Sequence, residues 1–135
     1  QEERPYMLHR ALFGSFERFM GLLIEHYSAA FPLWLSPVQV KVLSVSEKFN
    51  DYASEVVSAL KKKSIRVKLA DDGDSLPKKV RNGEKEKIPY LLVVGEKEVA
   101  DRTVAVRKRG QGDLGPQILA DFVELVSREN EERVI

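Results

Sequence analysis

Runs of β-branched and aliphatic residues alternate with a run of helical periodicity between residues 38 and 106. The runs typical of strands are Val38–Val45, Ile65–Leu69, Tyr90–Val94 and Thr103–Val106. Between the first two lies Glu47–Lys62, whose apolar residues recur at the spacing of one helix face. Two strands joined by a helix are parallel, because a parallel pair needs a crossover connection. The pattern therefore predicts an α/β domain built on a central sheet.

The composition of each strand predicts its place in that sheet. Tyr90–Val94 is apolar throughout, as expected of a central strand buried on both faces. Ile65–Leu69 alternates apolar and basic residues, so we expect one wetter face and a place nearer an edge. We interpret Gly95–Val99 as a turn, after which Thr103–Val106 returns as an antiparallel strand at one side of the sheet.

Three further segments have helical patterns. In Gly14–Ala30, apolar residues recur every three or four positions, with Ser15 as the predicted N-terminal cap. Ser46 is the predicted cap of the helix that follows it. Leu76–Lys87 predicts a short polar helix with Val80 facing inward. A closing amphipathic helix carries the apolar residues Ile118, Leu119, Phe122, Val123 and Val126.

The remaining segments are a predicted linker and two predicted loops. Phe31–Pro37 contains two prolines, which break helices, but it is too apolar for a floppy tether. We therefore expect it to pack against one of the units that it joins. Gly110–Pro116 is a predicted loop. Asp71–Ser75 is an acidic loop that lacks the ligand spacing and terminal glutamate of a calcium-binding loop, which disfavours metal binding there.

Length and composition bound the class of protein. With 135 residues, 43% of them hydrophobic, the chain can form one domain with its own core. It has no cysteine, which excludes disulfides and thiolate ligands and fits a reducing compartment, so we expect a cytoplasmic protein. Its apolar runs are far shorter than the ~20 residues of a membrane span. The chain begins at Gln1 in a charged segment without a signal-peptide pattern, and we expect it to be part of a longer protein.

Basic residues are concentrated in the middle of the chain. Residues 61–110 hold 15 Lys and Arg against 8 Asp and Glu, whereas residues 1–60 and 111–135 have net charges of −2 and −4. Steering depends on the local field more than on total charge, so the central block favours contact with a polyanion. The alternative is an ordinary solvated face of surface lysines, and charge alone does not decide between the two.

Signals for a self-contained active site are poor. No glycine-rich loop has the dinucleotide or P-loop pattern, since Gly110–Gly112 precedes neither a Lys-Ser/Thr pair nor a suitable helix start. His9 and His26 are far apart in sequence, which disfavours a histidine-based triad. His26 lies among apolar neighbours in a predicted helix, where a structural role is commoner than a catalytic one.

Several stretches resemble a known family. Met7–Ala11 followed by Gly14–Phe19 resembles motif 3 of the class II aminoacyl-tRNA synthetases, in which a strand leads into a helix bearing an ATP-binding arginine. Phe31–Val40 resembles the junction into the anticodon-binding domain of the threonyl-tRNA synthetases, which belong to class IIa. Further matching stretches are Ile65–Val67, Pro89–Val99, Val104–Arg107 and Asp113–Gly115. Together the matches run through nearly the whole chain without gaps.

The resemblance implies a fold with two parts. Residues 1–35 would form the C-terminal end of a class II catalytic core, with the motif 3 strand and helix. Residues 36–135 would form an anticodon-binding domain, a three-layer α/β structure with a mixed five-stranded sheet flanked by helices. The residue patterns predict four of those strands, and the fifth is implied by the resemblance alone. The helix at Gly14–Ala30 should pack less completely than the sheet, because its apolar face would cover a catalytic sheet that this chain lacks.

The resemblance also implies a partner, the anticodon loop of tRNA(Thr), which agrees with the central basic block. Glu98 and Arg107 fall where the threonyl enzymes carry polar residues that read anticodon bases, and Lys87 falls where a basic neighbour lies. Threonine anticodons end in G and U, whose edges suit a carboxylate acceptor and an arginine donor. Lys78 or Lys79 would add phosphate contacts. Both residues proposed to read bases also have a purely structural interpretation. Glu98 could be an ordinary turn carboxylate, and Arg107 could be a surface charge at a strand end.

For the full-length enzyme, the resemblance implies a homodimer, joined through the missing catalytic core, that ligates threonine to tRNA(Thr) with ATP, magnesium and zinc. Arg18 matches the ATP-binding arginine of motif 3, and His9 matches a zinc-binding histidine. Motifs 1 and 2 and the other zinc ligands are missing from this chain. We therefore expect the chain alone to be inactive and to hold no cofactor.

The chain departs from the family pattern at Asp72–Pro77, where Gly73 and Ser75 stand in place of an asparagine and a lysine. The acidic residues of this stretch would repel phosphates. An alternative function is therefore a protein-interaction module of the same fold that has lost RNA binding. A third possibility, an independent flavodoxin-like enzyme, has no candidate site residues. Salt-dependent affinity for threonine tRNA would separate the first two.

Overall fold

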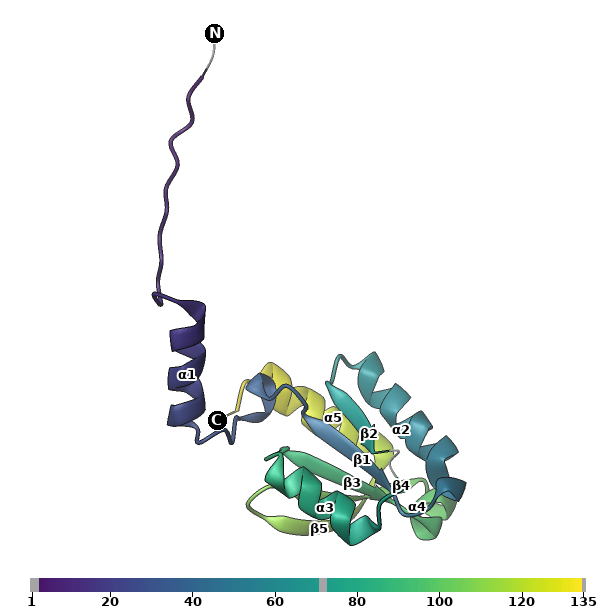
Figure 1. Ribbon diagram of the computed structural model, residues 1–135. Helices are drawn as coiled ribbons and strands as arrows, with labels where there is room; N and C mark the ends of the chain where they lie inside the picture. The colour runs from purple at the N-terminus through teal and green to yellow at the C-terminus, as the bar shows by residue number, and fades with distance from the viewer. Residues whose placement is uncertain (1–2, 71–72, 135) are drawn as a thin grey trace.

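A five-stranded sheet with helices on both faces forms the body of the computed structural model, which describes residues 3–70 and 73–134 (Figure 1). The elements in chain order are α1 (Phe16–His26), η1 (Leu33–Leu35), β1 (Val40–Ser44), η2 (Glu47–Phe49), α2 (Asn50–Lys62), β2 (Val67–Ala70), α3 (Leu76–Lys85), β3 (Tyr90–Val94), α4 (Glu96–Asp101), β4 (Thr103–Lys108), β5 (Gly112–Ile118) and α5 (Leu119–Glu131). The strand order is β2-β1-β3-β4-β5, with the first three strands parallel and the last two antiparallel to their neighbours. The predicted mixed α/β sheet is confirmed, with β3 at its centre and β2 at an edge.

The fifth strand lies where the sequence pattern predicts a loop. Gly112 and Gly115 adopt φ values of 78° and 80°, and the pairing of β5 with β4 shifts register between Val106 and Arg107. Pro116 is also part of β5, which is an edge strand. Glycine and proline are depleted in strand interiors but tolerated at edges and bulges. The prediction of a loop is therefore wrong from Gly112 to Pro116, whereas Gly110 and Gln111 do form a turn.

A short helix, α4, replaces the turn predicted at Gly95–Val99. The Gly95 amide donates a 2.9 Å hydrogen bond to Oε2 of Glu98, which is one arm of a capping box. Arg102 ends the helix in the left-handed conformation, with φ of 55°, and β4 begins at the next residue. The turn prediction is wrong because the chain makes a helical turn before it reverses.

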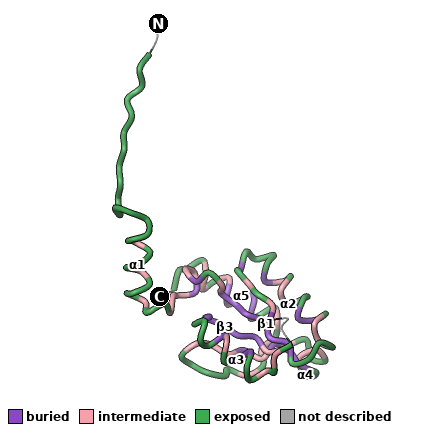
Figure 2. The backbone as a smooth tube through the Cα atoms, viewed as in Figure 1, coloured by how far each residue is buried: buried purple, intermediate pink, exposed green. Residues whose placement is uncertain are grey.

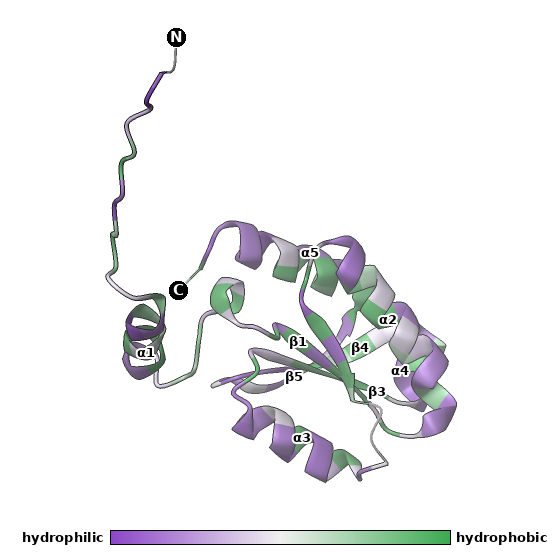
Figure 3. Ribbon diagram, turned by 45° about the horizontal axis from the view of Figure 1, so that its top comes forward, coloured by the Kyte–Doolittle hydropathy of each residue, from purple (hydrophilic) through white to green (hydrophobic). Residues whose placement is uncertain are grey.

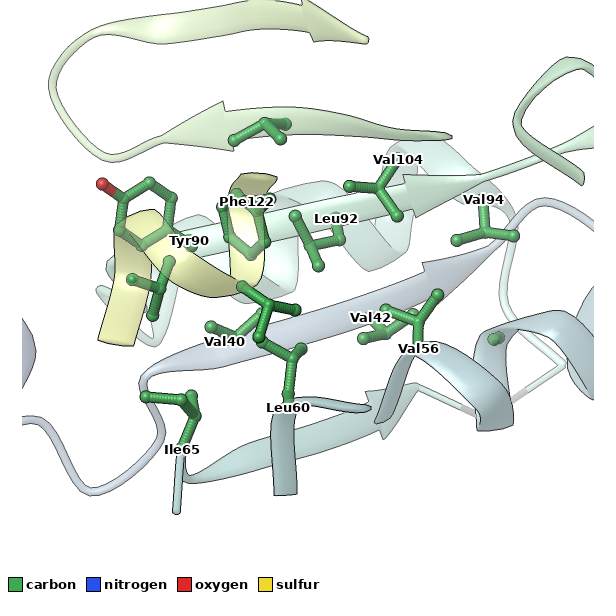
Figure 4. Close-up of a cluster of buried hydrophobic side chains, with 14 of the residues drawn as sticks. Val40, Val42, Val56, Leu60, Ile65, Tyr90, Leu92, Val94, Val104 and Phe122 are labelled. Atoms are coloured by element: carbon green, nitrogen blue, oxygen red, sulfur yellow. The ribbon is translucent and has the colours of Figure 1, made fainter. Parts of the chain in front are cut away.

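Two apolar clusters fill the space between the sheet and its helices. Figure 3 shows α2 and α5 on one side of the sheet and α3 on the other. In the larger, α2 and α5 cover one face; the close-up in Figure 4 labels Val40, Val42, Val56, Leu60, Ile65, Tyr90, Leu92, Val94, Val104 and Phe122. In the smaller, α3 covers Leu43, Ala70, Ile88 and Leu91 on the other face. A Cβ atom at Gly83 would lie 2.5 Å from Cδ2 of Leu91, so glycine lets α3 approach β3 closely.

The structure tests four local predictions. Ser15 caps α1, since its side chain accepts a 3.2 Å hydrogen bond from the amide of Arg18. Val80 packs inward against the smaller cluster, as predicted. Ser46 precedes the turn η2 but makes no capping hydrogen bond with its side chain, so that prediction is wrong. Ile118 is also misassigned, because it ends β5 and is 57% exposed instead of lying on the buried face of α5.

The linker and α1 differ in how they pack. Leu33 in η1 is buried in the larger cluster, which confirms that the linker packs against the sheet. In contrast, α1 stands away from the sheet and contains no buried residue, as predicted (Figures 1 and 2). Residues 3–11 form no strand, because a strand needs a neighbour to satisfy its backbone groups and none pairs with them among the described residues. No helix in the described part of the chain is long and apolar enough to cross a membrane.

Candidate nucleic-acid interface

The face of β4 and β5 on the α3 side is open. Val104 and Val106 are buried in the cluster beneath α2 and α5, so alternate residues of β4 face the opposite side. These residues are half-buried, and their partners on β5 are exposed. The side chains presented on this face are Thr103, Ala105, Arg107, Asp113 and Pro116. An uncovered sheet face of this kind is available to a ligand.

Arg107 is the cation best placed on the open face. Its side chain is 33% exposed and lies between two carboxylates, with Nη2 3.9 Å from Oε1 of Glu84 and Nη1 3.6 Å from Oδ2 of Asp113. Neither distance is that of a hydrogen bond, so the carboxylates orient the guanidinium without tying up its donors in short bonds. Arg107 is thus held in place and still able to donate to a ligand.

A groove lies beside Arg107. It has a volume of about 360 Å³, with Ile88 and Leu91 at its apolar part and Arg107, Arg109 and Glu84 among its charged residues. Pockets of roughly 300–1,000 Å³ lined by apolar surface and a few convergent polar groups are typical of ligand sites. The groove therefore offers an apolar surface to a flat ring and donors to its edge.

A larger groove, of about 910 Å³, lies between α2 and α5 on the opposite side of the sheet. Its charged residues balance, because Lys63, Arg102 and Arg128 face Glu55, Glu124 and Glu131. A polyanion gains little from a surface of mixed charge. We therefore place the candidate interface on the α3 side, although the groove there is smaller.

Glu98 lies at the other end of β3 from Arg107. Arg107 is paired with Leu91, whereas Glu98 caps the helix that begins after Gly95. At about 3.3 Å per strand residue, the four positions from Leu91 to Gly95 span about 13 Å. The structure therefore does not bring the two predicted readers together on one base. Oε2 of Glu98 is engaged by the Gly95 amide, so only Oε1 is available to a ligand while the cap is intact.

The predicted lysines take different roles. Lys87 is exposed, and its Nζ donates to the carbonyl of Ser28 in the segment that follows α1. Lys79 is only 6% exposed, and its Nζ donates to the carbonyls of Ser44 and Ala70 at 3.3 Å each. The prediction that Lys79 contacts phosphates is therefore wrong, because its ammonium lies beneath α3.

The acidic loop before α3 is described only in part. Asp71 and Asp72 lie outside the described residues, so the predictions for them are not tested by the structure. Asp74 accepts a 2.7 Å hydrogen bond from Nζ of Lys78, one helical turn further along. The side chain of Lys78 is 63% exposed and pairs with an acidic neighbour, which weakens its attraction for a phosphate.

A polar cluster at the start of β3 fixes the strand ends beside the groove. The Tyr90 hydroxyl donates to Oε2 of Glu129 at 2.9 Å, and Lys108 Nζ lies 2.9 Å from Oε1 of the same carboxylate. Burial raises the pKa of Tyr90 to about 12. Burial lowers the pKa of Lys108, but its bonds to Tyr90 and Glu129 outweigh that effect and raise it. The cluster ties α5 to β3 and β4 next to Arg107.

Sequence reasoning missed Arg109. Its guanidinium donates to the carbonyls of Ala30 and Phe31, at 3.1 and 2.6 Å, and to that of Lys87. Burial lowers the pKa of Arg109 below its usual value. The acceptors in the linker precede Arg109 by 78 and 79 positions, and they are backbone groups. No side-chain pattern in the sequence could reveal such contacts.

The two residues implied for ATP and zinc lie in the exposed N-terminal part. His9 and Arg18 are both exposed, and the backbone amide of Arg18 bonds to Ser15. Across residues 3–70 and 73–134, no three His, Asp or Glu side chains are grouped so that they could hold a metal ion. The described residues therefore do not by themselves fit a zinc site, and we derive no step through zinc.

These features define an α/β domain with an open sheet face and a positioned arginine beside a groove. The chain belongs to the anticodon-binding domain family, whose model matches residues 39–129. Over 98% of its length it is 50% identical to a threonine–tRNA ligase of Carboxydothermus hydrogenoformans and 52% identical to one of Clostridioides difficile. It spans 21% of the length of each of those two proteins.

The chain is also similar to a solved structure. The RNA-binding domain of threonyl-tRNA synthetase from Cryptosporidium parvum Iowa II is 34% identical and superposes with a TM-score of 0.80. The match covers 89% of this chain and 30% of that chain. The predicted resemblance to the threonyl-tRNA synthetases and the predicted anticodon-binding fold are thus confirmed.

Proposed function

We propose that this chain recognises the anticodon loop of tRNA(Thr) as part of a longer protein that ligates threonine to tRNA(Thr) with ATP. One observation carries the proposal: Arg107 is held on an uncovered sheet face, beside an apolar groove, in a domain of the anticodon-binding family. Single-stranded loops present unstacked bases, which proteins read by stacking and by bonds to their edges.

The surroundings of Arg107 favour a base over a phosphate. A phosphate brought to the guanidinium would also approach the carboxylates of Glu84 and Asp113, which lie 3.9 and 3.6 Å from it. A neutral base edge pays no such penalty and can accept from Nη1 or Nη2 through guanine O6 and N7 or uracil carbonyls. Arg107 is therefore assigned to base reading, whereas Arg81 and Lys85, exposed on α3, are assigned to phosphate contacts.

Glu98 and Lys87 complete the proposed interface with narrower roles. Oε1 of Glu98 would accept from the N–H groups of a second base, about 13 Å along β3 from the position of Arg107. Lys87 would contribute positive charge near the groove, since it is exposed and its backbone carbonyl accepts a hydrogen bond from Arg109, which lines the groove. The two readers would then contact different nucleotides.

The remaining parts of the proposal concern the longer protein. Residues 1–35 would end its catalytic core and residues 36–135 would form its anticodon-binding domain. Arg18 would contact ATP and His9 would join further ligands around zinc, with magnesium accompanying ATP. The longer protein would be a cytoplasmic homodimer joined through that core. The chain by itself would bind RNA without forming threonyl-adenylate.

Two measurements on the purified chain test this function. In the first, an anticodon stem-loop of tRNA(Thr) is titrated by fluorescence anisotropy at several salt concentrations. We expect binding that weakens as salt rises, because phosphate contacts release counterions. Lack of binding at low salt would contradict the proposal and favour a protein-interaction module.

The second measurement is threonine-dependent exchange of pyrophosphate into ATP, for which we expect no signal. A signal would contradict the assignment of the active site to the missing core.

A further inference from the structure

The carbonyl groups of the linker, and of the residues between α1 and the linker, are held by side chains from the sheet domain, which we define as the chain from residue 38 onward. At the end nearer the sheet, Gln39 Nε2 donates to the carbonyl of Leu33 at 2.9 Å. Arg66 donates to the carbonyls of Trp34 and Ser36 at 2.7 and 2.9 Å. These bonds use backbone acceptors that a loop would otherwise leave to water, so this half of the linker is fixed to β1 and β2.

At the end nearer α1, two cations make the same kind of contact. Arg109 donates to the carbonyls of Ala30 and Phe31, and Lys87 donates to that of Ser28. Arg109 also donates to the carbonyl of Lys87, so one guanidinium joins the linker to the segment between α3 and β3. Bonds from a charged donor are roughly twice as strong as neutral ones.

The backbone between α1 and these contacts has an unusual conformation. Ser28 and Ala29 have φ values of 49° and 60°, which is the left-handed region that residues with a Cβ seldom adopt. Such residues are strained and persist only where the surroundings determine them. The Lys87 ammonium donates a hydrogen bond to the carbonyl of Ser28, the first of these two residues. Arg109 donates to the carbonyl of Ala30, which directly follows the second. The turn that directs α1 is therefore held from both sides.

We propose that Arg109 is a positioning residue that fixes the direction in which α1 leaves the sheet domain. It is part-buried, it bonds to three carbonyl groups, and those groups lie on both parts that must be joined. Lysine could not replace it, because a single ammonium lacks the planar fork that reaches three acceptors. Arg109 follows Arg107 by two residues, so the candidate base reader and the linker contact lie at the same end of β4.

This arrangement has a consequence that rests on the proposed function. RNA bound at Arg107 would be held at a set angle to α1, and hence to whatever part of the longer protein α1 joins. The positioning role itself does not depend on RNA. Its test therefore uses the chain alone, and it can fail or succeed separately from the anticodon proposal.

The experiment measures the distance distribution between α1 and the sheet. The chain has no cysteine, so Glu25→Cys in α1 and Lys68→Cys in β2 give two unique sites for spin labels at exposed positions. Double electron–electron resonance is then recorded for the wild-type background and for Arg109→Ala. We expect one narrow distribution in the wild-type background and a distribution broadened roughly twofold or more in the variant, because the released linker samples other directions.

Two further variants make the result decisive. Arg102→Ala removes the same charge from an exposed arginine that pairs with Glu55 at 2.6 Å, and it should leave the distribution unchanged. Arg109→Lys keeps the positive charge but lacks the planar guanidinium, so it should broaden the distribution as Arg109→Ala does. If Arg109→Ala lacks the native circular-dichroism spectrum, Arg109→Lys takes its place in the test. A wild-type distribution as broad as that of the variants, or a narrow one in Arg109→Lys, would overturn the proposal.

Discussion

Glu98 has two proposed uses, and two substitutions separate them. In the chain without RNA, its Oε2 accepts from the Gly95 amide at 2.9 Å and begins α4. Glu98→Ala removes this bond and leaves the amide, which is buried in part, without its acceptor. Loss of a helix cap costs about 1 kcal/mol, within a range of roughly 0.5–2. Glutamine serves in capping boxes as glutamate does, so Glu98→Gln should cost only a few tenths of a kcal/mol.

Thermal unfolding followed by circular dichroism at 222 nm measures the difference. For a chain of 135 residues, about 1 kcal/mol corresponds to a decrease in Tm of roughly 3–5 °C. We therefore expect Glu98→Ala to melt a few degrees below the wild type and Glu98→Gln to melt close to it. If the two variants lose equal stability, or if Glu98→Ala loses none, the capping role is refuted.

The same pair of variants tests the reading of RNA. A glutamine that keeps the cap presents an amide with N–H donors where the glutamate presents a second acceptor oxygen. Donors facing the N–H groups of guanine are repulsive, so Glu98→Gln should weaken binding of the cognate stem-loop although the protein is as stable as the wild type. Wild-type affinity in Glu98→Gln would leave Glu98 with a structural role alone.

Three further outcomes are expected. Burial raises the pKa of Tyr90 from 10.0 to about 12, so the unfolded chain loses this proton near pH 10 while the folded chain keeps it. Urea unfolding should therefore show stability falling between pH 10 and 12 by about 1–2 kcal/mol more in the wild type than in Tyr90→Phe; equal slopes would contradict this. Gly83→Val should lower the free energy of unfolding, measured in urea, by about 1–3 kcal/mol, because even a Cβ at this position would lie 2.5 Å from Cδ2 of Leu91. Unchanged stability would show that α3 can move away from β3. Limited proteolysis should cut within residues 3–27 before it cuts the sheet domain, since no residue of α1 is buried, and uniform protection would argue against that packing.

The sequence predicted the buried strands because their composition has few alternatives. β3 is apolar throughout, and β1 carries Val40, Val42 and Leu43 in a strand whose every residue is buried. The sequence pattern did not predict β5, because Gly112, Gly115 and Pro116 are residues that strand interiors disfavour. They are tolerated here because β5 is an edge strand whose pairing with β4 shifts register. The sequence pattern also failed at α4, although a glycine followed three residues later by glutamate is a capping signal that could have been used.

The candidate site was predictable only where its residues act through side chains on regular strands. The resemblance implies a role for Arg107, and the alternation of side chains along β4 explains why it faces the open side. The sequence does not predict the contacts of Lys79 and Arg109, because both bond to backbone carbonyls of segments that the fold brings close. Backbone acceptors leave no trace in composition or periodicity, so only the three-dimensional structure shows them.

The proposed interface depends above all on Arg107 reading a base of the anticodon. The most direct test titrates Arg107→Ala and Arg81→Ala with two stem-loops at one fixed salt concentration, one carrying the G and U of the threonine anticodon and one with both replaced. We predict that Arg107→Ala loses about 1–3 kcal/mol against the cognate stem-loop and much less against the other, because base contacts discriminate and phosphate contacts do not. Arg81→Ala, on the exposed surface of α3, should affect both RNAs by equal factors. Equal losses on both RNAs for Arg107→Ala would show that Arg107 does not read a base.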